Sequence, residues 1–389
     1  MKRSIVLLLL VFGIVASVQG QNRDPKQVLR TLFVSGADAV AYTDQFANAV
    51  SESRLRSILE QITAQVGAFR EVRSDGNPYT LLFEEGTATA VIHVSEEGAV
   101  AGLRFTRITP AAADLSEAAD KLRALPGEVT VLVQADGRAR IAHNTDTPLA
   151  VGSTFKLAVL AAVQESLAEG GVTWEQVLRL EPQWRSLPSG LLQDWPEGSA
   201  VTVETLATLM ISQSDNTATD ALIRLVGRSS VEEFAPHTVP FPTTREAFVL
   251  KDPENAELRE RYLEASVPER RELLDSVAGR ELPEASLFTG EPVAPEIEWF
   301  FTTGELCSLM NRVAGLDLTT VNPGVADPQA WQRVSYKGGS EPGVLNLTTR
   351  LLAKDGTSYC VSVTQNRDTP IDETAFYAAY QGVLGALRE

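Results

Sequence analysis

The segment Val151-Gly152-Ser153-Thr154-Phe155-Lys156 places a serine and a lysine three residues apart, directly before a long apolar run. If a helix begins near Ser153, both side chains lie on one helical face, and the amine of Lys156 can reach the hydroxyl of Ser153. Burial and a second cation would lower the pKa of this amine, whose neutral form can accept the hydroxyl proton. The backbone N–H of a serine in the first helical turn is also free to bind an oxyanion. The segment predicts a serine nucleophile beside a lysine base, although the spacing alone is common by chance.

A second motif, Ser214-Asp215-Asn216, lies in a predicted turn between the apolar helical patterns of residues 203–211 and 217–226. An Asp-Asn pair in a turn usually serves the turn itself, because both side chains hydrogen-bond to the nearby backbone. The three-residue motif is nevertheless rare by chance, so it carries more weight than the serine–lysine pair.

A third motif, Lys337-Gly338-Gly339-Ser340, follows the predicted strand of residues 332–336 and could lay a cation and a backbone N–H along a cleft. Lys354-Asp355-Gly356-Thr357 fits the same pattern. Its Asp355-Gly356 lies between two predicted strands and is better explained as a hairpin turn. We therefore choose Lys337.

The order S-x-x-K, S-D-N, K-x-G resembles that of class A β-lactamases and penicillin-binding proteins, over residues 111–389. The surroundings of the first two motifs, Val151–Lys156 and Ile211–Ala218, also look like that family. The resemblance implies an α/β/α-type, β-lactamase-like transpeptidase fold with an inserted all-helical subdomain. We expect no metal or organic cofactor.

Carried over position by position, the resemblance implies four catalytic side chains: the nucleophile Ser153, its general base Lys156, the proton shuttle Ser214 and the cation Lys337. It implies four substrate-binding positions: Asn216, Gly339, Ser340 and Arg350. Of these, Arg350 is a weaker candidate for binding a substrate carboxylate. Lys337 would orient Ser214 and attract a carboxylate. The N–H groups of Ser153 and Ser340 would form the oxyanion hole.

One departure concerns the release step. In class A β-lactamases a loop that begins Thr-Arg presents the deacylating Glu five residues after the arginine. Thr244-Arg245 lies here at that family's spacing from the S-D-N motif, with Arg245 thirty-one residues after Ser214. The fifth residue after Arg245 is Leu250, which cannot activate water. Glu246 and Glu254 are nearby carboxylates, but charged loop residues are mostly solvated, so we expect both at the surface. The expected behaviour is acylation by β-lactams with slow release.

Residues 24–108 predict a small α+β domain, with a helix over 53–66 and four hairpin-linked strands at 68–72, 79–83, 88–94 and 99–105. This domain and the variant segment Lys337–Gly343 resemble a two-domain serine-hydrolase subfamily, one member of which belongs to clavulanic acid biosynthesis. The resemblance implies a steroid-isomerase or cystatin-like N-terminal fold.

The second domain, residues 111–389, has predicted strands near both ends and a helical middle. The strands fall at 129–134, 138–143, 332–336, 345–353 and 358–365, and a closing helix at 374–387. We expect the first and last strands to meet in one sheet. Residues 229–300 are rich in proline and acids, with predicted helices at 256–263 and 269–277. They are either a solvated face, which we favour, or a lid over the cleft.

The chain has 389 residues, is 44% hydrophobic and has a net charge of -17, so it repels nucleic acids and anionic lipids. Residues 1–20 predict a cleaved export signal, because Lys2 and Arg3 precede an apolar run to Val18 and the small Gly20 follows it. The apolar run is too short for a membrane span. No second hydrophobic span follows.

Two cysteines are too few for a disulfide framework. Export permits a bridge between Cys307, in the helical pattern of residues 303–313, and Cys360, in a predicted strand, but we favour two free buried thiols. The histidines, His93, His143 and His237, lack a catalytic or metal-binding context, so we expect structural or surface roles.

The sequence therefore predicts an exported two-domain serine hydrolase that forms an acyl-enzyme through Ser153. Its substrates would be β-lactams, D-Ala-D-Ala-like peptides or esters, and the departure at Leu250 favours the last two. A non-hydrolytic penicillin sensor or peptidoglycan-docking protein is the alternative. The oligomeric state does not follow from the sequence.

Overall fold

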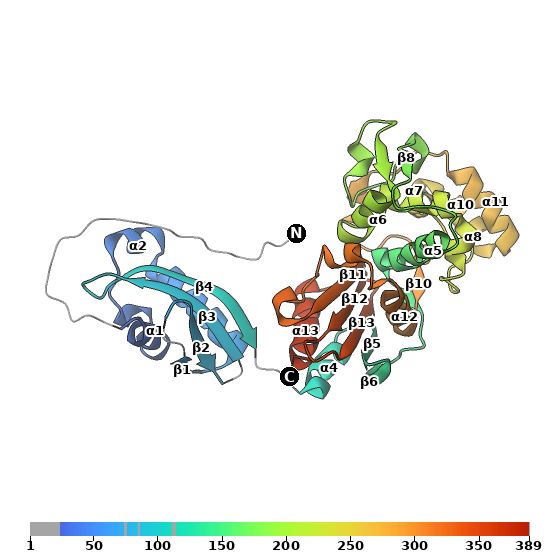
Figure 1. Cartoon of the computed structure of the whole chain (residues 1–389). Helices are drawn as coiled ribbons and strands as arrows, with labels where there is room; N and C mark the ends of the chain where they lie inside the picture. Colours follow the sequence, from blue (N-terminus) through green and yellow to red (C-terminus); the bar gives the residue numbers. More distant parts are fainter. Residues whose placement is uncertain (1–23, 74–75, 85, 111–113, 389) are drawn as a thin grey trace. The chain divides into compact units, whose positions relative to one another are not determined.

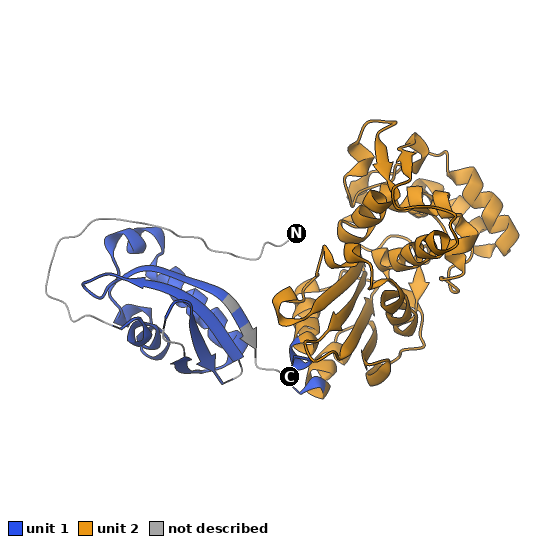
Figure 2. Ribbon diagram, viewed as in Figure 1, with its two compact units in different colours: residues 1–115, 385–389 blue, residues 116–384 orange. Residues whose placement is uncertain are grey.

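The computed structural model of the chain describes four stretches, residues 24–73, 76–84, 86–110 and 114–388. The chain divides into two compact units, residues 1–115 with 385–389, and residues 116–384 (Figure 2). The predicted export signal, residues 1–20, lies outside the described residues.

The N-terminal unit packs three helices on an antiparallel sheet (Figure 1). Its elements are α1 (Pro25–Val34), α2 (Asp44–Ala49), α3 (Glu52–Val66), β1 (Phe69–Arg73), β2 (Tyr79–Phe83), β3 (Gly86–Val94) and β4 (Val100–Pro110). The strands follow one another in the order β1-β2-β3-β4. Helix α3 buries Leu55, Leu59, Ile62 and Val66, the face that the sequence periodicity predicts. The α+β prediction for this unit is confirmed, and its steroid-isomerase or cystatin-like type stays a prediction.

The larger unit is built on a five-stranded antiparallel sheet with the order β11-β12-β13-β5-β6. The strands are β5 (Glu128–Ala135), β6 (Arg138–His143), β11 (Arg333–Glu341), β12 (Val344–Leu352) and β13 (Ser358–Asn366). Strand β5 pairs with β13, from Ala135 opposite Tyr359 to Glu128 opposite Asn366. The first and last strands of the unit therefore meet, as predicted.

Helices cover both faces of this sheet: α12 (Thr303–Val313) lies on one, and α13 (Glu373–Ala386) on the other, near α4 (Leu115–Arg123) (Figure 1). Tyr380 of α13 donates a hydrogen bond to the Val361 carbonyl, 3.0 Å away, on β13. On the opposite face, Cys307 of α12 forms a disulfide with Cys360 of β13, with their Cα atoms 5.9 Å apart. The favoured prediction of free thiols is wrong, because the sheet brings a helix face and a strand 53 residues apart to bonding distance.

The helical part is inserted between β6 and β11. It comprises α5 (Lys156–Ala168), α6 (Val203–Ser212), α7 (Asn216–Val226), α8 (Arg228–Glu232), α9 (Thr244–Lys251), α10 (Ala256–Glu264) and α11 (Val267–Val277). It also holds two short strand pairs, β8 (Val177–Arg179) with β9 (Ala200–Thr202), and β7 (Leu149–Ala150) with β10 (Phe300–Phe301). Helix α5 is buried along its whole first half, and an apolar sequence without a polar face fits this central position.

Strand β11 is longer than predicted and lies at the edge of the sheet. The segment Lys337–Ser340 continues the strand, whereas we predicted that it would follow the strand. Glycines are tolerated at a sheet edge, and the turn Pro342-Gly343 lets β12 pair with β11 up to Glu341, which lies opposite Val344.

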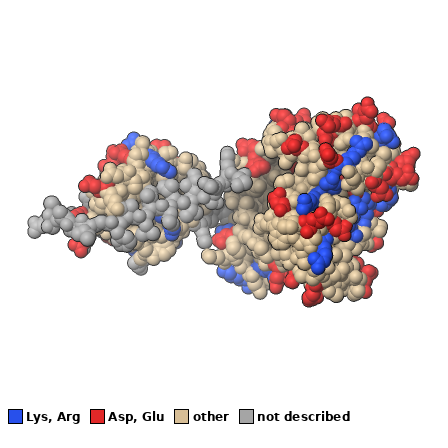
Figure 3. Space-filling model, turned by 90° about the horizontal axis from the view of Figure 1, so that it is seen from above, with Lys and Arg blue, Asp and Glu red and all other residues tan. Residues whose placement is uncertain are grey.

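Acidic and basic side chains lie interspersed over the visible face of the larger unit (Figure 3). Acidic residues outnumber basic ones across the chain, 51 against 34, and the exclusion of polyanionic partners stays a prediction. Among the described residues, no helix is both long and apolar enough to cross a membrane.

Candidate active site

Ser153 and Lys156 lie at the start of the central helix of the larger unit. Residues Gly152–Phe155 form a 3-10 turn that leads directly into α5, which begins at Lys156. The amine of Lys156 lies 3.1 Å from the Ser153 hydroxyl. The three-residue spacing thus brings the two groups together, with Ser153 in the turn and not in the α-helix itself.

The Ser214–Asn216 turn between α6 and α7 supplies further partners for the same amine. Lys156 Nζ donates to the Ser214 carbonyl and to Asn216 Oδ1, both at 2.6 Å, and lies 3.1 Å from Ser214 Oγ. Asp215 holds the turn, because one of its oxygens accepts the Ala218 N–H and the other accepts the N–H groups of residues 191 and 192. The prediction of a turn between two helices is confirmed.

Ser214 has a backbone φ of +57°, a left-handed conformation that is unfavourable for a residue with a side chain. Two hydrogen bonds to its carbonyl oxygen stabilise it there: one from Lys156 and one from Ser189 Oγ at 2.7 Å. This conformation places the Ser214 hydroxyl between two lysines.

Lys337 of strand β11 is the second of these lysines. Its Nζ lies 3.1 Å from Ser214 Oγ, and the residue is 2% exposed. Burial lowers the pKa of Lys337 to about 7. Burial and, after it, the charge of Lys337 lower the pKa of Lys156 well below its usual value. Lys156 is therefore suited to the role of a neutral base.

The backbone of β11 passes close to the backbone of the 3-10 turn. A Cβ built on Gly339 would lie 2.3 Å from the Ser153 nitrogen, and one built on Gly152 would lie 3.1 Å from the Ser340 nitrogen. Only glycine at position 339 allows this approach. The two N–H groups assigned to the oxyanion hole thus lie on neighbouring segments.

A cavity of about 310 Å³ opens beside these groups. Its polar lining includes Ser153, Ser189, Asn216, Thr244, Thr289, Ser340 and Glu341. Its aromatic lining comprises Phe155, Phe248, Phe288 and Trp299. A volume of this order suits a small organic group.

The remaining predicted positions lie apart from this cavity. Arg350 donates to Asn311 Oδ1 of α12 at 3.1 Å and is absent from the described lining. Leu250 is fully buried in the helical core. Glu254 is exposed, as predicted. The described lining contains none of the three histidines.

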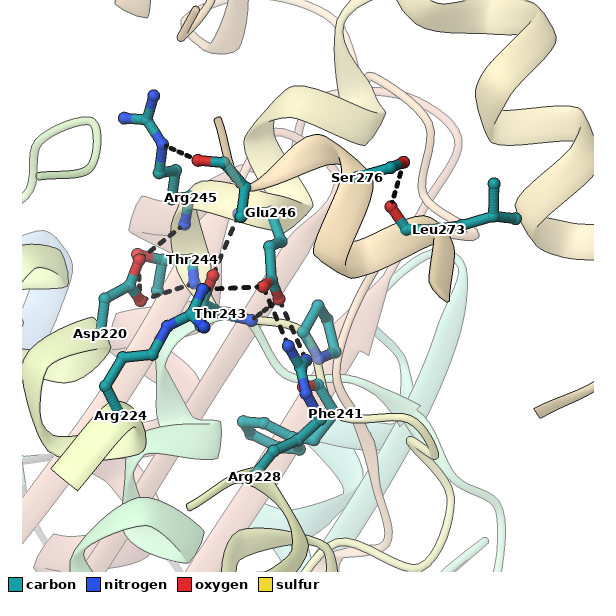
Figure 4. Close-up of polar contacts among 12 residues, drawn as sticks. Asp220, Arg224, Arg228, Phe241, Thr243, Thr244, Arg245, Glu246, Leu273 and Ser276 are labelled. Atoms are coloured by element: carbon teal, nitrogen blue, oxygen red, sulfur yellow. Dashed lines mark hydrogen bonds and ion pairs between the residues drawn. The ribbon is translucent and has the colours of Figure 1, made fainter. Parts of the chain in front are cut away.

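Glu246 was expected at the surface, and that prediction is wrong. Its carboxylate is fully buried and accepts hydrogen bonds from Arg228 at 2.9 and 3.0 Å and from Arg224 at 3.1 Å (Figure 4). It also accepts the Thr243 N–H at 2.8 Å and closes a capping box at the start of α9. A carboxylate held by two arginines is structural here.

Asp220 of α7 holds the same helix start from the other side (Figure 4). It accepts the N–H groups of Thr244 and Arg245 at 2.7 and 2.9 Å, and the Thr244 hydroxyl at 2.8 Å. Burial raises the pKa of Asp220 to about 7, against the effect of these hydrogen bonds. Asp220 and Glu246 together fix α9, which carries Thr244 and Phe248 to the cavity wall.

The sequence reasoning missed Ser189, Phe288, Lys251 and Glu341. Lys251 is buried and forms ion pairs with Glu298 and Glu341. Glu341 directly follows the third motif, and this adjacency was the available signal. Phe288 comes from the segment between α11 and β10, for which the favoured prediction was a solvated face and the alternative a lid over the cleft.

Comparisons with known proteins concern the family and the fold. Residues 112–266 match the model of the Beta-lactamase enzyme family. The β-lactamase VEB-1 of Pseudomonas aeruginosa is 30% identical over 95 residues, which are 23% of this chain and 31% of that enzyme, so the match spans about a third of its length. The crystal structure of a β-lactamase from Sphaerobacter thermophilus is 23% identical, with a TM-score of 0.50, over 70% of this chain and 95% of that one.

These findings confirm the predicted resemblance to class A β-lactamases. The chain has a mixed α+β architecture, and its larger unit has a β-lactamase-like fold.

Proposed function

We propose that the protein is an exported serine hydrolase that forms an acyl-enzyme through Ser153. One observation carries the proposal: a buried lysine with a lowered pKa lies 3.1 Å from the Ser153 hydroxyl, beside a cavity that can hold a substrate. A neutral amine within hydrogen-bond reach of a hydroxyl meets the geometric requirement for a general base.

In the proposed reaction, Lys156 takes the proton from Ser153 as Oγ attacks the substrate carbonyl. The N–H groups of Ser153 and Ser340 stabilise the oxyanion. Ser214 passes a proton to the leaving nitrogen or oxygen, and Lys337, 3.1 Å from its hydroxyl, keeps it oriented. Asn216 binds the substrate amide.

Substrates are proposed to be β-lactams, D-Ala-D-Ala-like peptides or esters, with slow release of β-lactam products. The burial of Leu250 and the arginine pairing of Glu246 support slow release, because neither residue can activate water. Glu341 is the only carboxylate among the described cavity-lining residues, and it is paired with Lys251. The same observations favour the alternative, a penicillin sensor that stays acylated.

Export is supported by the Cys307–Cys360 disulfide, because such bonds persist in oxidising compartments. We propose residues 1–20 as the signal, 24–108 as the small N-terminal domain and 111–389 as the hydrolase domain. Residues 229–300, or part of them, form the proposed lid, since Ala285, Phe288 and Thr289 line the cavity.

Incubation with benzylpenicillin and with a chromogenic ester, followed by intact-mass analysis and product release, tests the proposal. We expect a stable adduct on Ser153, absent in Ser153→Ala. In Lys156→Ala the acylation rate should fall by about 10³-fold, the scale of a lost general base. Lys354→Ala, which removes an exposed lysine from the rejected motif, should leave the rate unchanged.

Steady ester hydrolysis would support the enzyme, and an adduct without turnover of any substrate would support the sensor. Rapid penicillin turnover would contradict slow release. The absence of both an adduct and product release, with both compounds, would reject the proposal.

A further inference from the structure

The cavity beside Ser153 has aromatic walls and a single charged side chain among the described residues that line it. Phe248 of α9 and Phe288 form one wall, with ring centroids 5.0 Å apart. The charged side chain is that of Glu341. An apolar part of a ligand therefore meets aromatic rings, and a charged part meets a carboxylate.

Glu341 belongs to a buried cluster of two carboxylates and one amine. Lys251 donates hydrogen bonds to Glu298 and to Glu341. The side chains of Lys251 and Glu298 are each 1% exposed, and that of Glu341 is 18% exposed, so Glu341 is the member that solvent and ligands reach. With all three groups ionised, the cluster has one negative charge in excess.

The free protein can offset this excess with a proton. Burial and the neighbouring charge of Glu341 raise the pKa of Glu298 above its usual range. A ligand cation beside Glu341 would supply the missing positive charge in place of that proton. A ligand anion at the same point would be repelled.

The place of Glu341 along β11 indicates which ligand atom it meets. It directly follows Ser340, whose N–H is assigned to the oxygen of the reacting carbonyl. One residue of strand spans about 3.4 Å, so Glu341 lies within reach of the side chain that the acyl group carries beside that carbonyl. The ring of the same acyl group can then lie against Phe248 and Phe288.

We propose that the cavity selects acyl groups whose side chain combines an aromatic ring with a protonated amine, and that Glu341 recognises the amine. This inference rests on the proposed function, since it concerns the acyl group that Ser153 receives. It adds no covalent step.

Three penicillins that share the nucleus and the phenyl ring test it: on the α-carbon of the side chain, ampicillin carries an ammonium, benzylpenicillin no charge and carbenicillin a carboxylate. Dissociation constants are measured by calorimetry on full-length Ser153→Ala, below neutral pH where the ampicillin amine is protonated. We expect ampicillin to bind about tenfold tighter than benzylpenicillin, and carbenicillin about tenfold weaker, the scale of one hydrogen bond to a charged group. Acylation rates of the unmodified protein should follow the same order.

Variants show which side chain causes the order of the three dissociation constants. In Ser153→Ala/Glu341→Gln the three constants should agree within about twofold, whereas the matched control Ser153→Ala/Glu254→Gln, which changes an exposed carboxylate, should keep the order. Should Glu341→Gln fail to fold, Phe288→Ala gives a second test, because losing the ring should weaken all three penicillins several-fold while their order persists.

The outcomes separate the two proposals. Equal constants for the three penicillins in Ser153→Ala overturn the selectivity even if Ser153 is acylated in the unmodified protein. The expected order of binding without any acylation supports the selectivity and rejects the proposed function. No binding and no acylation reject both.

Discussion

At the scale of single residues, the hydroxyl of Ser214 lies 3.1 Å from the amines of both Lys156 and Lys337. Both amines are buried, and two ammonium groups this close repel each other. Protonation of Lys337 therefore makes protonation of Lys156 harder. Beside burial, which has the larger effect, the residue proposed to orient the shuttle thus also favours the neutral form of the proposed base.

Replacement of Lys337 by methionine should consequently move the pH dependence of acylation. The competent form of Lys156 is the neutral amine, so the acylation rate falls as pH drops through its pKa. Lys337→Met removes the cation that lowers this pKa, so the acid limb of the pH–rate profile should shift to higher pH. The measurement is the rate of adduct formation with benzylpenicillin at a series of pH values.

The matched variant Lys354→Met changes an exposed lysine in a turn and should leave the limb in place. If the acid limb of the pH–rate profile is unchanged or shifts to lower pH in Lys337→Met, the two amines do not interact as described.

At the scale of elements, α9 is held at its start by two buried carboxylates, Asp220 and Glu246 (Figure 4). Glu246 forms ion pairs with both Arg224 and Arg228, and its loss would leave two guanidinium groups without their anionic partner. Breaking a buried ion pair by removing one partner is strongly destabilising.

Glu246→Gln should therefore lower the free energy of unfolding by about 3 kcal/mol. The measurement is urea denaturation followed by tryptophan fluorescence. The matched change Glu254→Gln, at an exposed carboxylate, should stay within about 0.5 kcal/mol of the unmodified protein. A loss of similar size in both variants would contradict the structural role of Glu246.

The bond between α12 and β13 leads to a second prediction at this scale. The Cys307–Cys360 disulfide closes a loop of 53 residues, and such cross-links contribute about 2–4 kcal/mol. Reductant should lower the urea midpoint of the unmodified protein and leave that of Cys307→Ala/Cys360→Ala unchanged. Equal midpoints for the oxidised protein and the double variant would show that the bond adds no stability.

Local pattern was enough to predict elements whose signals lie within a few residues. The apolar periodicity of residues 53–66 predicts α3 to within one residue, and that of 303–313 matches α12. The glycines of Lys337–Ser340 broke the strand signal. Strand β11 continues because it pairs with β12, a contact that local propensity does not contain.

The sequence predicted the candidate-site residues that belong to its motifs. It missed the contacts that only the three-dimensional fold creates. Ser153, Lys156, Ser214 and Lys337 meet through side-chain contacts, although their roles stay predictions. The burial of Glu246 depends on two arginines 18 and 22 residues earlier in the chain, a pairing that no local rule indicates. The disulfide likewise depends on a Cα distance.

At the scale of the whole molecule, each unit has a hydrophobic core of its own. The smaller one packs Leu32, Ile62, Leu81 and Ile92, and the larger one is centred on α5. Separate cores can unfold in separate steps.

All five tryptophans, residues 174, 184, 195, 299 and 331, belong to the larger unit. Tryptophan fluorescence should therefore report one urea transition, that of the larger unit, whereas far-UV circular dichroism records both units. We expect the two curves to differ. Coincident curves at every urea concentration would mean that the units unfold as one.

The approach of β11 to the 3-10 turn limits how this protein could be redesigned. A Cβ at position 339 would lie 2.3 Å from the Val151 carbonyl oxygen and 2.5 Å from the Thr154 nitrogen, closer than any real side chain can come. A saturation library at this codon should return glycine alone among active clones. Efforts to broaden the substrate range should instead randomise Phe248 and Phe288, where the wall is made of replaceable rings and not of backbone.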